Sequence, residues 1–161
     1  MFMNGQLLET WNQEYLTTLK VLRSYPGNKL AFKPHERSRS AKELAWTFVL
    51  EEKTIAGALN GYFNLQNLPP APATMPEILN AYEKGHSDLV GRINTLSDGD
   101  FNRTVKFPVG PKQMGNIRCR DLIERMIMDN VHHRGQFSVY LRMAGGKVPS
   151  IYGPSADEPW T

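Results

Sequence analysis

The sequence has a single cysteine, Cys119, among its 161 residues. One thiol cannot form an internal disulfide, and it cannot supply the several thiolates of a structural zinc site. A disulfide-stabilised secreted domain is therefore excluded, and a reducing, cytoplasmic location is expected. The first ten residues agree with this expectation, because they carry Asn, Gln and Glu where a signal peptide has a basic end and an apolar core.

Long apolar runs and a strong net charge are also missing. No segment approaches the roughly 18 consecutive apolar residues of a membrane-spanning helix, so we expect no membrane partner. The 19 Lys and Arg residues and the 16 Asp and Glu residues give a net charge of only +3. A net charge this small gives little support for nucleic-acid binding, and the sequence has no recognised nucleic-acid-binding motif. A nucleic-acid partner is therefore not expected.

Helical periodicity dominates what is present. Apolar residues recur every three or four positions in four segments. These segments span residues 6–24, 40–62, 74–96 and 120–144. Ser40 with Glu43, and Thr74 with Glu77, have the spacing of capping boxes and predict where the second and third helices begin. The length fits one domain and no fixed-period repeat occurs, so we predict that residues 1–161 form a single domain.

Four amphipathic helices in one small domain predict an all-α fold, a four-helix bundle. The connections after the first and third helices are long, so a bundle with a crossover is as consistent with these lengths as a simple up-down-up-down one. Residues 104–107 fit one strand of a small hairpin, with its turn at Gly110 and Pro111. Residues 148–161, which contain three prolines, are expected to lie extended on the surface.

Polar residues interrupt two of the apolar helical faces. Thr47 and Glu51 fall on the face of the second helix, and Asp129 and His133 fall on the face of the fourth. Each pair is four residues apart, so its members lie one turn apart on the same face. We therefore expect Glu51, Asp129 and His133 to converge at one end of the bundle, with Thr47 lining the same cavity.

Burying these charges is unfavourable unless they are paired or bind a cation. A divalent metal would resolve the conflict, and helical bundles commonly build metal sites from facing helices. Two other interpretations stay open. The carboxylates of Glu51 and Asp129 can face water at the bundle end, or His133 can hydrogen bond to Asp129 in a network without a metal.

The remaining titratable residues suggest less specific roles. His132 lies about 100° around the helix from His133, which indicates a boundary or subunit-contact position. His35 and His86 stand among polar residues and are expected to be solvated. Cys119, just before the fourth helix, lacks the neighbours of a catalytic dyad and is expected to be a packed or semi-exposed thiol.

The fourth helix and the tail carry a recognisable pattern. It reads His-His-Arg-Gly-Gln at residues 132–136, Tyr-Leu-Arg at 140–142, Val-Pro at 148–149 and Tyr-Gly-Pro-Ser at 152–155; the second helix adds Glu-Leu-Ala-Trp at 43–46. This pattern resembles the DinB-like family, which is related to the bacterial thiol-dependent S-transferases of the same four-helix-bundle superfamily. The resemblance implies a bundle with a long crossover connection, often dimeric, with a divalent metal such as nickel, zinc or iron in a pocket at one end.

The family's usual metal site has three histidines, and this sequence departs from it at two of them. His133 matches the last histidine, whereas Asp129 stands four residues before it and Thr47 follows the tryptophan of the second helix. Asp129 can ligate a divalent cation, but a threonine is a poor substitute for histidine. Glu51, one turn after Thr47, can fill the gap as a ligand or as a general base.

Two functional interpretations follow from these departures. The first is a metal-dependent thiol transferase or hydrolase acting on a small molecule, with an altered, oxygen-rich site for Ni²⁺, Zn²⁺, Mn²⁺ or Fe²⁺. The second is a non-catalytic, stress-related bundle that binds a small molecule and has lost its metal. Metal content separates the two.

Two further expectations concern packing. The family resemblance and the apolar residues Trp11, Phe137 and Met143 on the first and fourth helices predict a homodimer. Gly135 stands in the middle of the fourth helix, where glycine costs about 1 kcal/mol relative to alanine. This cost predicts that another backbone approaches Gly135 closely.

Overall fold

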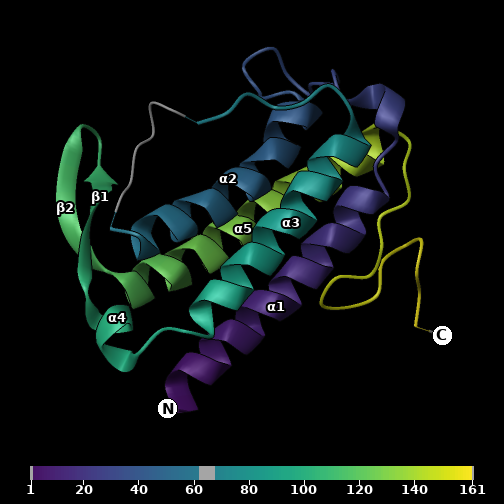
Figure 1. The fold of residues 1–161 in the computed structure, drawn as a ribbon. Helices are drawn as coiled ribbons and strands as arrows, with labels where there is room; N and C mark the ends of the chain where they lie inside the picture. Colours follow the sequence, from purple (N-terminus) through teal and green to yellow (C-terminus); the bar gives the residue numbers. More distant parts are fainter. Residues whose placement is uncertain (1, 62–67, 161) are drawn as a thin grey trace.

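The computed structural model describes residues 2–61 and 68–160 of the chain. Four long helices and one short helix accompany a two-stranded sheet in this part (Figure 1). In chain order these elements are α1 (Phe2–Arg23), α2 (Ala41–Leu59), α3 (Met75–Ile93), α4 (Asp98–Asn102), β1 (Thr104–Gly110), β2 (Gln113–Arg118) and α5 (Cys119–Met143), and a 3-10 turn covers Gly27–Lys29. The fold is thus mainly helical, and the hairpin makes the all-α description only approximate.

The α2 and α3 helices begin where their capping residues predict, whereas α1 begins at Phe2, earlier than the predicted residue 6. Ser40 accepts a hydrogen bond from the backbone of Glu43 and donates its own backbone N–H to the Glu43 carboxylate, and Thr74 and Glu77 do the same for α3. The α2 helix ends at Leu59, earlier than predicted, and Tyr62, the predicted end, lies outside the described residues.

Among the four long helices, two that are consecutive in the sequence do not always pack against each other. The α1 helix packs mainly against α3 and α5, and α2 packs mainly against the same two helices. The connections from α1 to α2 and from α3 to α5 therefore join diagonally placed helices. The second of these connections contains α4 and the antiparallel hairpin, whose turn at 110–113 includes Lys112 with a φ of 57°. The predicted strand and turn are both confirmed.

The core has two apolar clusters, one toward each end of the long helices. One combines residues 19–25 of α1 and its following turn with the first half of α2 and α3 and the end of α5. The other combines Leu7 and Trp11 with the second half of α2 and α3, the hairpin and the start of α5. Buried polar side chains lie between the clusters, namely Thr18, Glu51, Glu52, His86, Asn130 and Arg134. The molecule thus buries a polar layer midway along its helices.

Two of the packing expectations are wrong. Trp11 and Phe137, expected on a dimer surface, are buried in the two core clusters, whereas Met143 is exposed. Gly135 is exposed and a Cβ there would meet no neighbouring atom within 4 Å, so no backbone approaches it. Gly146, by contrast, is closely packed, because a Cβ there would lie 2.3 Å from Leu141 Cδ1.

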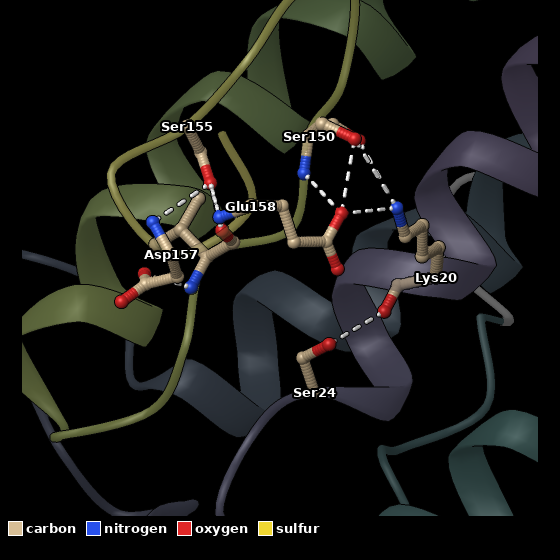
Figure 2. Close-up of polar contacts among 7 residues, drawn as sticks. Lys20, Ser24, Ser150, Ser155, Asp157 and Glu158 are labelled. Atoms are coloured by element: carbon tan, nitrogen blue, oxygen red, sulfur yellow. Dashed lines mark hydrogen bonds and ion pairs between the residues drawn. The ribbon is translucent and has the colours of Figure 1, made fainter. Parts of the chain in front are cut away.

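The C-terminal segment lies on the surface, as expected, but the expectation that it is extended is wrong, because it folds back so that the backbone N–H of Val148 donates to Asp157 Oδ2 and its carbonyl accepts from the Ser155 hydroxyl. The segment is held on α1 and α5. Glu158 accepts hydrogen bonds from Lys20 of α1 at 2.7 Å and from the backbone N–H of Ser150 at 2.8 Å (Figure 2). Asp157 pairs with Arg142 of α5 at 2.6 Å. These contacts keep residues 148–158 against the helices, although the segment has no regular secondary structure.

Candidate metal centre

The three predicted ligand residues come together in the polar layer. Asp129 and His133 lie one turn apart on α5, and Glu51 reaches them from α2, which packs against α5. His133 Nδ1 lies 3.1 Å from Glu51 Oε1 and 3.6 Å from Asp129 Oδ2. One ligand atom from each residue can be chosen so that all three lie within 4.8 Å of one another. The group lies between the two core clusters, so its predicted position at one end of the helices is wrong.

The burial of the three side chains is graded. The Glu51 side chain is 3% exposed, that of His133 is 12% exposed and that of Asp129 is 43% exposed. The group therefore has a buried inner side at Glu51 and opens toward solvent at Asp129. A cation reaching it would enter from the α5 surface.

Burial and hydrogen bonding shift the acid–base behaviour of this group. Desolvation raises the pKa of Glu51 to about 7, although contacts with His133 and Asn130 oppose the shift. The hydrogen bond that protonated His133 donates to Glu51 is the main cause of a raised pKa at His133, with Asp129 contributing in the same direction. Near neutral pH the Glu51–His133 pair therefore retains a proton that a cation must displace.

Asn130 completes the surroundings of Glu51, and the sequence interpretation did not include it. Its Nδ2 donates to Glu51 Oε2 at 2.9 Å, and its side chain is buried. A signal was present in the sequence, because Ile123, Ile127, Asn130, Arg134 and Phe137 recur at spacings of three and four. All five are buried, so this stripe marks the inward face of α5.

Thr47 occupies a different environment from the three ligand candidates. It is half-buried, and its hydroxyl accepts a hydrogen bond from Arg39 Nη1 at 2.9 Å and donates to the backbone of Glu43. Arg39 and His133 line a surface cavity of about 530 Å³, together with Ser38, Leu44, His132, Gln136, Val139 and Tyr140. Thr47 is not among the residues that line this cavity and is connected to it only by the hydrogen bond from Arg39.

A second buried histidine–carboxylate pair lies on the other side of α2. His86 of α3 is buried, with Nδ1 3.1 Å from Glu52 Oε1 and Nε2 2.8 Å from Asn12 Oδ1. Its ring stacks on Tyr15 at a centroid distance of 3.6 Å. The expectation of a solvated His86 is wrong, because its polar sequence neighbours lie on the outer face of α3 while its own position faces inward.

The other candidates lie apart from the metal group. His132 is exposed, and its Nε2 lies 2.9 Å from the side-chain nitrogen of Gln136. His35 is exposed as well. Cys119 is the first residue of α5 and its side chain is buried, so the packed-thiol interpretation is confirmed.

Comparisons with known proteins agree with this architecture. The sequence matches the profile of the DinB family over residues 1–160. The chain belongs to the DinB family. It is 28% identical over 153 residues to "Uncharacterized protein YrdA" of Bacillus subtilis (strain 168), a match that covers 94% of this chain and 89% of the relative.

Two solved structures of DinB-like proteins share the fold. The protein from Bacillus cereus ATCC 10987 superposes with a TM-score of 0.77 at 24% identity, covering 91% of this chain and 95% of the other. The protein YjoA from Bacillus subtilis gives a TM-score of 0.73 at 19% identity, covering 91% and 97%. Across residues 2–61 and 68–160, none of the helices of this DinB family member has the length and apolar character needed to span a membrane.

Proposed function

We propose that this DinB family member is a divalent-metal-dependent enzyme, a thiol transferase or hydrolase acting on a small molecule, with an altered metal site. The observation that carries the proposal is the convergence of Glu51, Asp129 and His133, whose ligand atoms lie within 4.8 Å of one another. One imidazole and two carboxylates suit a hard or borderline cation such as Zn²⁺, Ni²⁺, Mn²⁺ or Fe²⁺. A buried carboxylate beside an imidazole also gains from a cation that neutralises it.

Each residue has a distinct role in this proposal. His133 and Asp129 are ligands from α5, and Glu51 is a ligand or a general base from α2. A bound divalent cation supplies Lewis-acid activation of a nucleophile. Because burial raises the pKa of Glu51 to about 7, this carboxyl can hold or release a proton near neutral pH, as a general base must.

The adjoining cavity indicates the kind of substrate. Its volume of about 530 Å³ fits a small molecule. Arg39 and Gln136 offer hydrogen-bond donors in its wall, and Tyr140 and Val139 offer apolar surface. A substrate with an anionic group and a short apolar portion is complementary to this lining.

Metal analysis of protein purified without chelators tests the proposal. We expect about one divalent cation per chain after titration with Zn²⁺ or Mn²⁺. His133→Ala should abolish this binding. His132→Ala is the matched control, because His132 is adjacent in sequence but exposed and directed at Gln136. Failure of the wild-type protein to bind Zn²⁺, Ni²⁺, Mn²⁺ or Fe²⁺ would reject the metal-dependent enzyme.

The alternative is a non-catalytic, stress-related protein that binds a small molecule and has lost its metal. One observation favours it: Glu51 already has partners for both oxygens, His133 at Oε1 and Asn130 at Oε2. Such a pair can exist without a cation. The alternative predicts ligand binding in the cavity that is unchanged by added metal.

We also propose that the protein works as a homodimer in the cytoplasm. The supporting feature is a set of exposed apolar side chains on α1 and α5 outside the cavity, namely Leu16, Met128 and Met143. Burying such residues against a second copy removes apolar surface from water. Sedimentation at micromolar concentration should show twice the 18.3 kDa chain mass, and a purely monomeric profile would contradict the dimer.

A further inference from the structure

Arg134 belongs to the His-His-Arg-Gly-Gln motif at residues 132–136 but is not a candidate metal ligand. It directly follows His133, yet its side chain points toward α1 and is 1% exposed. Its Nη2 pairs with Glu14 Oε2 at 2.6 Å, and its Nη1 donates to the Thr18 hydroxyl at 3.0 Å. A guanidinium group has only donors, so every neighbour that contacts it through a hydrogen bond must accept.

Because Arg134 can only donate, it also fixes the hydrogen-bond directions of Thr18 and Asn130. The Thr18 hydroxyl accepts from Arg134 and donates its single proton to Asn130 Oδ1 at 2.7 Å. Asn130 therefore presents its carbonyl oxygen to Thr18 and its NH₂ group to Glu51. The reversed amide would place Oδ1 against a carboxylate oxygen, and two acceptors facing each other in a buried site are unfavourable.

The two oxygens of Glu51 consequently have different surroundings. Oε2 accepts the hydrogen bond from Asn130 at 2.9 Å, whereas Oε1 faces His133 and the cavity side of the group. Holding one oxygen in this way orients the carboxylate plane. Partners that orient ligand side chains commonly change metal affinity by 10–100-fold when they are removed, a range of about 1.4–2.7 kcal/mol.

We propose that Arg134 and Thr18 fix the amide of Asn130, which in turn aims Glu51 Oε1 at the cation site. This inference rests on the proposed metal site, and it makes Asn130, Thr18 and Arg134 positioning residues. None of the three belongs to the group of candidate ligands.

The C-terminal segment forms the outer end of the same network. The hydroxyl of Tyr152 donates to Glu14 Oε2 at 2.6 Å and accepts from Arg134, and the Arg134 guanidinium carbon lies 5.1 Å from the centre of the Tyr152 ring. The contacts of Glu158 with Lys20 hold the segment that carries Tyr152 (Figure 2). The network therefore connects this surface segment to the candidate ligand Glu51.

Thr18→Val and Thr18→Ser make a matched pair of variants to test this. Valine keeps the shape of threonine but removes the hydroxyl, whereas serine keeps the hydroxyl. Titration with Zn²⁺ should show affinity about tenfold lower in Thr18→Val and close to wild type in Thr18→Ser. In the metal-free protein, NMR should show the side-chain NH₂ of Asn130 protected from exchange in wild type and in Thr18→Ser, and unprotected in Thr18→Val.

A more conservative variant guards against misfolding of Thr18→Val. Tyr152→Phe removes one hydroxyl at the solvent-facing end, and it should lower Zn²⁺ affinity by roughly two- to threefold, less than the loss of an inner partner. Wild-type affinity in both Thr18→Val and Tyr152→Phe, or an exchange-labile Asn130 amide in the wild-type protein, would overturn the positioning network alone. Absence of Zn²⁺ binding by the wild-type protein would reject the metal site, and the positioning role with it.

Discussion

Glu51 and Glu52 are consecutive residues of α2 whose buried carboxylates lie beside different histidines. Glu51 contacts His133 of α5, and Glu52 contacts His86 of α3. Consecutive helical residues point about 100° apart, so adjacent side chains of one helix can contact two different neighbouring helices at the same level along its axis. The first pair adjoins a cavity and a second carboxylate, whereas the second pair is enclosed by the helices. This difference in access separates the candidate functional site from a structural pair.

Cation binding should strengthen as pH rises. A cation must displace the proton retained by Glu51, whose pKa burial raises to about 7, and by His133, whose pKa Glu51 raises above 6.5. Affinity for Zn²⁺ should therefore fall by up to about tenfold per pH unit for each displaced proton as the pH drops below 7. Titrations between pH 5.5 and 8 measure this slope, and the same slope in His132→Ala assigns it to the buried pair. A flat profile would contradict the assignment.

The stability of the metal-free protein should change in the opposite direction. The folded pKa of Glu51, about 7, exceeds its ordinary value of 4.5. Its contribution to stability is therefore complete below pH 4.5 and is lost as the pH rises through 7. We expect the Tm of metal-free protein to fall between pH 5 and 8, and Glu51→Gln to reduce that fall. Equal falls in the two proteins would show that Glu51 is not the responsible group.

Replacing His86 should destabilise the fold without weakening the metal site. His86→Leu leaves the buried Glu52 carboxylate without its imidazole partner, a change expected to cost about 3–5 kcal/mol. Burial already raises the pKa of Glu52, so the loss should be smaller at acidic pH, where this carboxyl is protonated. His35→Leu is the control and should change stability by no more than about 1 kcal/mol, because His35 is exposed and its ring only accepts one hydrogen bond, from the backbone N–H of Arg37. Denaturant unfolding gives both values, and Zn²⁺ titration of the folded fraction should show unchanged affinity.

Two glycines should respond to alanine with opposite signs. At Gly146 a Cβ would lie 2.3 Å from Leu141 Cδ1 and 3.1 Å from the backbone oxygen of Ser24, so Gly146→Ala should destabilise by about 1–3 kcal/mol. At Gly135 no atom lies within 4 Å of the added carbon, and Gly135→Ala should stabilise α5 by about 1 kcal/mol. Thermal unfolding of both variants measures the difference. A destabilised Gly135→Ala variant would contradict this prediction and would favour a backbone packed closely against Gly135.

The C-terminal segment should loosen at low pH. Hydrogen bonds from Lys20 and Ser150 lower the pKa of Glu158 to about 2. Its contribution is therefore present above pH 4.5 and is lost as the pH falls through 2. Glu158→Gln should reproduce this loosening at neutral pH, seen as faster hydrogen exchange of the Ser150 backbone N–H. Asp88→Asn removes an exposed ion pair with Lys84 and should leave that exchange unchanged.

Much of the fold could be predicted from local sequence signals. The capping boxes at Ser40 and Thr74 and the hairpin turn near Gly110 depend on residues close together in the chain, so they are visible without tertiary information. The short α4 helix is not predicted by the periodicity, although Ser97 and Asp100 carry the same capping pattern, because five residues are too few to show a helical period.

The candidate site could be predicted only in part. The sequence by itself determined that Asp129 and His133 share one side of their helix, because a spacing of four residues places side chains on one face. Only the tertiary structure decided that Glu51 is buried whereas Asp129 is exposed. Only the tertiary structure decided that Asn130 contacts Glu51 and that His86 is buried. Such contacts depend on how each helix is rotated about its axis against its neighbours. A rotation of one residue, about 100°, exchanges an exposed side chain for a buried one, and the packing of all the helices together sets that rotation.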